Sequence, residues 1–181
     1  MTVQNTIESM AKQARKAGRE LASLSTARKN AALAKMAAAL EKQKDYIRAE
    51  NAKDLAAGRE KGLSAAMLDR LELSDKVIGS MVAGVLEVIA LPDPVGEISD
   101  MARRPSGIVV GRMRIPLGVI GMIYESRPNV TVDAGVLCLK AGNGVLLRGG
   151  SEAIHSNLAL AKVMQEVLVE EQINPAALQV I

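Results

Sequence analysis

The chain has 181 residues, of which 49% are hydrophobic, and it carries a formal net charge of +3. With one cysteine and one histidine it cannot build a disulfide framework or a Cys/His metal cluster, so we expect no metal site and a cytoplasmic protein. No apolar run reaches the roughly 20 residues of a membrane span, so no membrane partner is expected. The mild basic excess suits an anionic small molecule, and a nucleic-acid partner is not expected because aromatic residues make up only 1% of the chain.

The first ninety residues have the pattern of amphipathic helices. Apolar residues recur at three- and four-residue steps over residues 3–24 and 27–55, and Lys and Glu fill the opposite face. A short helix is expected over residues 65–71. Another is expected over residues 74–91, because a Ser-Asp pair opens it and Pro92 ends it.

The next segment is typical of extended chain. Residues 103–107 contain Pro and Gly and predict a turn. Residues 108–115 alternate enough to predict an exposed strand with Arg112 and Arg114 on one face.

Residues 117–148 follow the order strand, turn, helix, strand. The continuous apolar run over residues 117–123 predicts a parallel strand covered on both faces. A helix is expected over residues 130–140, and the glycines after it lead into a short buried strand over residues 145–147. Arg148 follows directly and is expected to point out of the carboxyl edge, where α/β sheets bind ligands.

The remaining residues continue the α/β order. Ser151 is the predicted N-cap of a helix over residues 152–170, and residues 178–181 have the pattern of a third strand. Two strands and the beginning of a third cannot bury both faces of a parallel sheet. We therefore expect a truncated α/β fold, with the chain a fragment of a longer protein.

Several segments are specific enough to indicate a family. The chain contains RIPLGVIGMIYESRPNVT, followed by LCLKAGN and LLRGG, and upstream it contains GLSAAMLDRLELSDK and LPDPVGEI. These segments closely resemble the glutamate-5-semialdehyde dehydrogenases, also called gamma-glutamyl phosphate reductases, of the aldehyde dehydrogenase superfamily. The resemblance covers almost the whole chain.

The resemblance implies an aldehyde-dehydrogenase-like fold in three parts. Residues 1–98 would form a helical N-terminal layer of the cofactor domain, and residues 99–116 would form a strand or hairpin of the oligomerisation region. Residues 117–181 would be the first βαβα part of a Rossmann-like NADP-binding domain. The catalytic domain would lie beyond residue 181, and the full-length protein would form a homo-oligomer.

The resemblance also implies an oxidoreductase that uses NADPH to reduce L-glutamate 5-phosphate to L-glutamate 5-semialdehyde, in L-proline biosynthesis. That chemistry needs a cysteine thiolate to attack the acyl phosphate. Cys138 lies in an apolar helical stretch, where burial would raise the pKa of the thiol, so it is predicted to be a core residue. The nucleophile is expected beyond Ile181, and the chain alone is expected to be inactive.

Two segments are predicted to bind NADP(H). By composition alone, Arg148 is equally a solvated cation or a bidentate partner for the 2′-phosphate of NADPH. The resemblance favours the cofactor, because the superfamily places a ribose-binding Lys at the matching position. The backbone after Ile123 is expected to pass the nicotinamide end, and Glu152 shares the ligand edge. The predicted cofactor-binding residues are Ile123, Tyr124, Glu125, Ser126, Arg148, Gly149, Gly150 and Ser151.

Three further residues have two interpretations each. Asn129 is a possible amide donor to a developing oxyanion, and it is also a good N-cap for the helix that follows. Arg127 either meets a substrate phosphate or carboxylate or faces solvent. His155 shows no partner in the sequence and is expected to be structural or solvated.

Two other function classes stay open at this point. The first is a noncatalytic nucleotide-binding or assembly module, a naturally short chain that keeps the helical layer without turnover. The second is a basic helical nucleic-acid binder, which only the pI of about 9.1 suggests.

Overall fold

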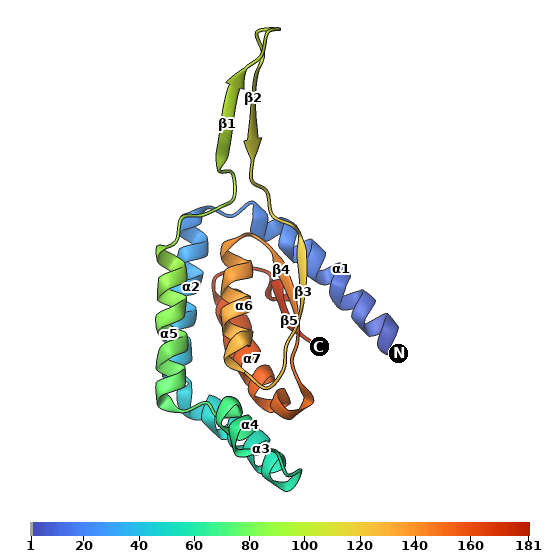
Figure 1. Ribbon diagram of the computed structural model, residues 1–181, viewed down its shortest axis with the longest axis vertical. Coiled ribbons are helices and arrows are strands. Elements are labelled where there is room, and N and C mark those ends of the chain that lie inside the picture. Colours follow the sequence, from blue (N-terminus) through green and yellow to red (C-terminus); the bar gives the residue numbers. More distant parts are fainter. Residues whose placement is uncertain (1) are drawn as a thin grey trace.

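The computed structural model describes residues 2–181, and Met1, which falls in the layer expected over residues 1–98, lies outside the described residues. The described chain begins with five helices, where the hydrophobic periodicity predicts four (Figure 1). No helix among residues 2–181 is long and apolar enough to cross a membrane. Four of the five begin at a Ser or Thr whose hydroxyl accepts from the backbone N–H three residues on, namely Thr2, Ser25, Ser64 and Ser74. The helices are α1 (Val3–Ala22), α2 (Thr26–Lys42), α3 (Lys44–Glu60), α4 (Ala65–Leu71) and α5 (Asp75–Ala90).

The single helix predicted over residues 27–55 is wrong, because the structure divides it at Gln43. Gln43 has φ −100° and ψ 17°, which ends α2 and lets α3 leave in a new direction. α2 runs beside α5, whereas α3 turns away toward α4 (Figure 1). Both halves pack against α7, but α2 also packs against α5 and α3 against α4, and no Gly or Pro marks the break in the sequence.

An antiparallel hairpin follows the helices. It consists of β1 (Ile98–Arg103) and β2 (Val109–Met113), with an irregularity in the register between Ser99 and Ala102. All residues of both strands are exposed, and the hairpin extends away from the rest of the chain (Figure 1). The prediction of an exposed strand over residues 108–115 is confirmed for its central part.

A three-stranded parallel sheet forms the second part of the fold, in the order β3-β4-β5. α1 crosses close to the amino ends of its strands, where a side chain on Gly144 would collide with the carbonyl oxygen of Ala14. The fold is therefore α/β, as predicted. The elements are β3 (Val119–Ile123), α6 (Asn129–Lys140), β4 (Gly144–Arg148), the 3₁₀ turn η1 (Ser151–Ala153), α7 (Ile154–Glu170), the 3₁₀ turn η2 (Pro175–Ala177) and β5 (Leu178–Val180).

β3 and β4 differ in how far their two faces are buried. β4 is buried on both faces from Gly144 to Leu147, as a central parallel strand should be. β3 is predicted to be covered on both faces, and this is wrong: Gly121 is exposed and Ile123 is 81% exposed. Only the face of β3 that carries Ile120 and Met122 packs against the core.

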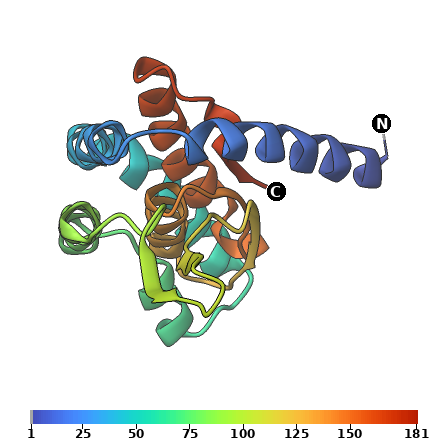
Figure 2. The same cartoon turned by 90° about the horizontal axis from the view of Figure 1, so that it is seen from above.

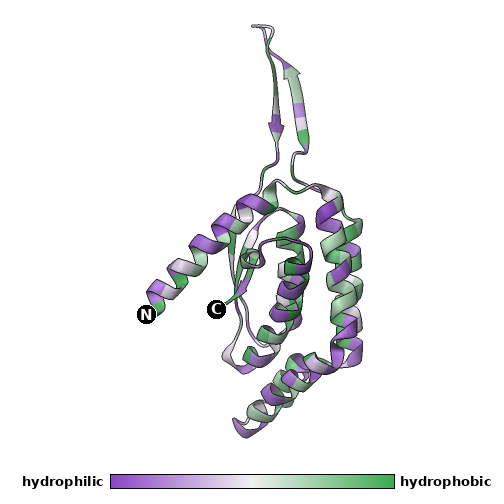
Figure 3. Cartoon of the chain, turned by 180° about the vertical axis from the view of Figure 1, so that it is seen from behind, coloured by the Kyte–Doolittle hydropathy of each residue, from purple (hydrophilic) through white to green (hydrophobic). Residues whose placement is uncertain are grey.

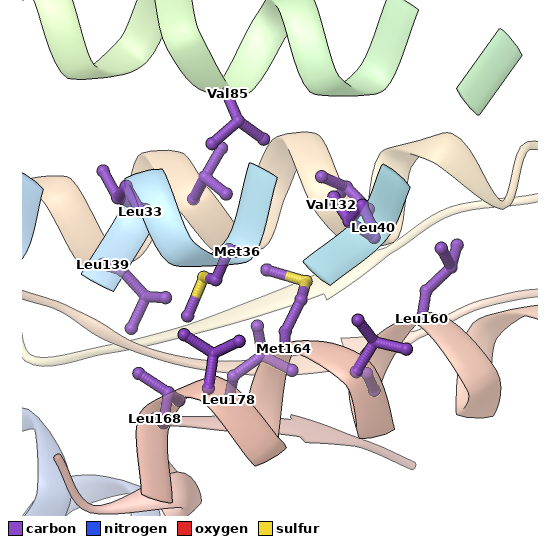
Figure 4. Close-up of a cluster of buried hydrophobic side chains, with 14 of the residues drawn as sticks. Leu33, Met36, Leu40, Val85, Val132, Leu139, Leu160, Met164, Leu168 and Leu178 are labelled. Carbon is purple, nitrogen blue, oxygen red and sulfur yellow. The ribbon is translucent and has the colours of Figure 1, made fainter. Parts of the chain in front are cut away.

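The core joins the helical layer to the sheet. It is built from Leu, Ile, Val, Ala and Met, since the chain has no Phe or Trp. Met36 of α2 and Met164 of α7 are both fully buried and meet Leu139 and Leu178 in the cluster of Figure 4. Figure 3, which is coloured by hydropathy, shows that the helices around the centre carry much of the hydrophobic surface, while α1 is more hydrophilic. The view from above shows α1 reaching out past this core toward the N-terminus (Figure 2).

A buried group of charges connects α2, the segment after α5, and α6. Lys29 is 2% exposed, and its Nζ lies 2.5 Å from Oδ2 of Asp93 and donates to the carbonyl oxygen of Lys140 at 3.2 Å. Lys140 is itself buried, and its Nζ donates to Oδ1 of Asn30 and to the carbonyl oxygen of Ile89. Each charge keeps hydrogen-bond partners, as buried charges must.

Candidate cofactor-binding edge

The carboxyl ends of β3 and β4 lie side by side. Ile123 is the register partner of Arg148, and the backbone N–H of Tyr124 donates to the carbonyl oxygen of Arg148 at 3.1 Å. The loop after β3 and the turn after β4 therefore start from the same edge of the sheet. This is the edge at which parallel α/β sheets bind ligands.

Side chains also join the two segments. The hydroxyl of Ser126 is nearly buried and donates to Oε1 of Glu152 at 2.7 Å. The structure thus brings the two predicted segments together through Ser126 and through Glu152, which shares this edge in the sequence prediction.

Gly149 and Gly150 leave no space for side chains. A Cβ on Gly149 would lie 3.2 Å from Cε2 of Tyr124 and closer still to the side-chain amide of Asn157. A Cβ on Gly150 would collide with the carboxylate of Glu152. The turn after β4 therefore offers bare backbone to a ligand, which suits the close approach of a phosphate or a ribose.

Arg148 is an exposed cation directly at the carboxyl end of β4. None of the ion pairs found among the described residues includes it. A guanidinium in this state can pair with an anionic ligand through two parallel hydrogen bonds. Ile123 and Glu125 are also exposed, so these predicted contact residues are accessible at the same edge.

A chain of hydrogen bonds that the sequence does not reveal lies under the edge. The hydroxyl of Tyr124 lies 2.6 Å from Oγ1 of Thr131, and Oγ1 of Thr131 lies 2.9 Å from Oδ1 of Asn157. Thr131 and Asn157 are at most 1% exposed. Burial raises the pKa of Tyr124, so the phenol keeps its proton at neutral pH.

Two cavities adjoin the loop after β3. The smaller, about 170 Å³, is lined by two guanidinium groups, those of Arg70 from α4 and Arg127, together with Tyr124, Glu125, Ser126 and Val130. The larger, about 460 Å³, lies between α5 and the start of α6 and holds Lys76 and Asp133. Arg70 carries no signal in the sequence, because α4 is brought to the loop only by the fold.

Asn129 does not cap the helix that follows it, so the N-cap prediction is wrong. α6 begins at Asn129 itself, Pro128 occupies the N-cap position, and no side chain caps the helix. Instead Nδ2 of Asn129 donates to Oδ2 of Asp133 at 3.1 Å, because a carboxylate one turn along the helix is within reach of the amide. Burial raises the pKa of Asp133, and its hydrogen bond with Asn129 only partly opposes this.

Ser151 is not the cap of the next helix either. Ser151 opens the 3₁₀ turn η1, and α7 starts only at Ile154. The carboxylate of Asp54, in α3, takes the capping role and accepts from the backbone N–H of His155 at 3.1 Å and of Ser156 at 2.7 Å. A carboxylate near a helix N-terminus also interacts favourably with the helix dipole.

Cys138 and His155 have the structural surroundings that the sequence predicts. Cys138 is 9% exposed, and burial raises the pKa of its thiol, which confirms the core assignment. The side chain of His155 is 49% exposed, with Nδ1 3.9 Å from Oε2 of Glu50. Within residues 2–181, no group of three His, Cys, Asp or Glu side chains is arranged to hold a metal ion.

Comparison with known proteins shows which proteins this chain is similar to. No protein-family model matches the chain. The curated gamma-glutamyl phosphate reductases of Desulfotalea psychrophila and Geotalea daltonii are 59% and 60% identical to it over all 181 residues. The chain is homologous to the gamma-glutamyl phosphate reductases. It spans 43% of the length of each of these two relatives.

Solved structures of gamma-glutamyl phosphate reductases have the same fold. The protein from Thermotoga maritima superimposes with a TM-score of 0.92 at 42% identity, over 96% of this chain and 42% of its own. The protein from Saccharomyces cerevisiae superimposes with a TM-score of 0.92 at 30% identity, over 100% of this chain and 46% of its own. A glyceraldehyde-3-phosphate dehydrogenase from Methanocaldococcus jannaschii, solved with NADP, superimposes with a TM-score of 0.66 at 15% identity, over 100% of this chain and 37% of its own. This last comparison shows likeness of fold alone. The predicted aldehyde-dehydrogenase-like fold is confirmed.

Proposed function

We propose that this chain supplies the cofactor-binding edge of an enzyme that reduces L-glutamate 5-phosphate to L-glutamate 5-semialdehyde with NADPH, in L-proline biosynthesis. The observation that carries the proposal is the pairing of β3 with β4, which sets the exposed Arg148 and the bare Gly149-Gly150 turn beside the loop that starts at Tyr124. The homology to gamma-glutamyl phosphate reductases supplies the reaction. When bound, NADPH would supply the hydride.

Arg148 is proposed to recognise the 2′-phosphate that distinguishes NADPH from NADH. Its guanidinium is exposed and stands where the turn has no side chains to obstruct a nucleotide. A planar, permanently charged group matches a phosphate through a bidentate pair, which a ribose hydroxyl cannot form. Gly149, Gly150 and Ser151 would approach the nucleotide through their backbone.

The two cavities are proposed to receive the substrate. The guanidinium groups of Arg70 and Arg127 suit an anionic group of L-glutamate 5-phosphate, either its phosphate or its carboxylate. The larger cavity is lined by Asp69, Glu72 and Asp133, none of which belongs to an ion pair of the described residues, so the cavity suits the substrate ammonium. Asp133 is proposed as its contact, because it is hydrogen-bonded to Asn129, the proposed oxyanion donor. Asn129 remains a proposed amide donor to a developing oxyanion.

The nucleophile is proposed to lie outside these 181 residues. The reaction needs a thiolate that attacks the acyl carbon, releases phosphate and leaves a thioester for hydride to reduce. Cys138 does not fit this role, because it is buried in the core with a raised pKa. The chain by itself is therefore expected to bind nucleotide without turnover.

The exposed hairpin is proposed to join copies of the protein into a homo-oligomer. Met101, Val109 and Met113 are each more than half exposed on its two strands, which leaves apolar side chains in water.

We also propose a cytoplasmic location, since the single cysteine is a free thiol, the state that a reducing compartment maintains.

The proposed function is tested with a complete reductase that contains this sequence. We expect NADPH oxidation that depends on L-glutamate 5-phosphate, and NADPH binding measured by calorimetry. Binding without turnover would favour the noncatalytic module instead. A protein that neither binds NADPH nor turns over would refute the proposal.

A further inference from the structure

The side-chain amide of Asn157 is buried, and only one of its two polar atoms has a hydrogen-bond partner. It lies in the first turn of α7 and is 1% exposed. Its Oδ1 accepts a hydrogen bond from Oγ1 of Thr131 at 2.9 Å. Its Nδ2 has no partner, and it is the only buried side-chain nitrogen or oxygen of residues 2–181 in that state. An unpaired buried donor opposes folding, so an apolar side chain of similar size would make a better core residue.

The unpaired half of the amide faces the turn after β4. If Gly149 carried a Cβ, the nearest atom to it would be Nδ2 of Asn157, followed by Cε2 of Tyr124 at 3.2 Å. The amide and the phenol ring thus occupy the space that a side chain at residue 149 would fill. They support the backbone of the turn directly after Arg148.

The paired half of the amide determines the direction of the hydrogen-bonded chain. Thr131 has one hydroxyl proton and gives it to Oδ1 of Asn157, so the hydroxyl of Tyr124 donates to Oγ1 of Thr131. The phenol oxygen is then left as an acceptor at the half-buried edge. Three elements, the loop after β3, α6 and α7, are held in one arrangement by this chain.

We propose that Asn157 is a positioning residue for nucleotide binding. Its amide supports Gly149 on one side and, through Thr131, fixes the phenol of Tyr124 on the other, so that the two segments of the edge are spaced for a dinucleotide. The inference rests on the proposed NADPH site. It also explains why a half-paired amide occupies a position at which a leucine would pack without an unpaired donor.

The test compares nucleotide binding in variants of a complete reductase that contains this sequence. Asn157→Leu keeps the branched shape of the side chain and Thr131→Val replaces only a hydroxyl by a methyl group, so both break the chain, and calorimetry with NADPH should show Kd raised by about 5- to 30-fold. Thr131→Ser keeps the hydroxyl and should restore Kd to within about twofold of the wild type.

Ser156→Ala is the matched control. Ser156 is the neighbouring residue in α7 and is equally buried, but its hydroxyl bonds to Asn51 and Asp54 of α3 and takes no part in the hydrogen-bonded chain from Tyr124 to Asn157. Ser156→Ala should lower Tm and leave the Kd for NADPH unchanged. If Asn157→Leu and Thr131→Val behave in the same way as Ser156→Ala, the role of Asn157 is structural and the inference is overturned.

A second experiment, based on a steric clash, applies if Asn157→Leu does not fold. Gly149→Ala adds a methyl group against the amide, so it should weaken NADPH strongly in the wild type and less in an Asn157→Ala background, where the amide has gone. Equal weakening in both backgrounds would overturn the inference. A wild-type protein that binds no NADPH would refute the proposed function itself, which is a distinguishable result.

Discussion

The hydroxyl of Ser126 donates a 2.7 Å hydrogen bond to the carboxylate of Glu152, and this bond connects the loop after β3 to the turn after β4. The same carboxylate fills the space beside Gly150 that a Cβ would occupy. The negative charge is therefore held back over the turn, and the positive charge of Arg148 remains exposed at the edge. An anionic ligand group would meet the exposed cations Arg148 and Arg127 here, beside one exposed carboxylate, that of Glu125.

Arg148→Ala should weaken the binding of NADPH more than the binding of NADH. The difference should be about 1.5 to 3 kcal/mol if one charge-assisted bidentate contact is lost. Arg148→Lys keeps the charge without the planar fork and should recover only part of the affinity. Dissociation constants for both nucleotides, measured at fixed salt, check this prediction. Equal weakening of the two nucleotides would show that Arg148 does not discriminate between them.

Cys138→Ala should leave the turnover of a complete reductase within about twofold of the wild type. The buried thiol has a raised pKa, so the substitution removes packing and no reactive thiolate. We expect a stability loss of about 1 kcal/mol, because one small buried group is removed. Loss of turnover with an intact circular dichroism spectrum would contradict the core assignment.

Asp133→Asn should raise the KM for L-glutamate 5-phosphate by about 10-fold, as expected for the loss of one charged contact with an ammonium group. An analogue that lacks the amino group should bind wild type and variant equally well. Asp69→Asn, which changes another carboxylate of the same cavity, serves as the control. If the variant weakens both ligands to the same degree, Asp133 does not contact the ammonium.

Acid should destabilise the chain partly through Asp93. Burial alone would raise the pKa of this carboxyl, but hydrogen bonds from Lys29, the backbone of Val95 and Thr26 outweigh it and hold the pKa below its ordinary value. The stabilisation is therefore present above the unfolded-state pKa of about 3.9 and is lost as pH falls through the lower folded-state value. Lys29→Met should cost about 3 to 5 kcal/mol at pH 7, since it leaves a nearly buried carboxylate without its cation. Urea unfolding of the wild type and of Lys29→Met between pH 7 and pH 2 measures this contribution. If the free energy of unfolding falls with pH in the same way in both proteins, the assignment is incorrect.

Asp54→Ala should destabilise the chain by about 2 to 3 kcal/mol, because it leaves two backbone N–H groups of α7 and the hydroxyl of Ser156 without their acceptor. Ser64→Ala, which removes an exposed local cap of α4, should cost only about 1 kcal/mol. Thermal unfolding of both variants measures the difference. Similar losses would mean that water or another side chain replaces the carboxylate.

Local pattern predicted most of the elements, because each depends on residues close together in the chain. The short helix over residues 65–71 and the helix that begins after Ser74 follow from capping residues and apolar spacing. The strand predicted over residues 145–147 lies within β4, and the strand-helix-strand order predicts its parallel pairing with β3, whereas the register that sets Arg148 beside Ile123 comes from the structure. The candidate edge was therefore predictable as two segments that meet.

The remaining features depend on contacts between distant residues. Gln43 ends a helix without any local breaker, because α2 and α3 meet α7 at different places while α2 also packs on α5 and α3 on α4. Asn157 is 26 residues from Thr131, and Arg70 reaches the loop after β3 only through the fold. Ser151 and Asn129 are good capping residues by type, yet their local sequence does not show where each helix actually begins.

The carboxylate that starts α7 belongs to a helix about one hundred residues earlier in the chain. Residues 117–181 therefore do not form an interchangeable module. If they were grafted onto another scaffold without α3, the helix after the nucleotide turn would begin with two unsatisfied N–H groups. Chimeras between this chain and its gamma-glutamyl phosphate reductase relatives should thus be most stable when the crossover keeps α3 and α7 from the same parent.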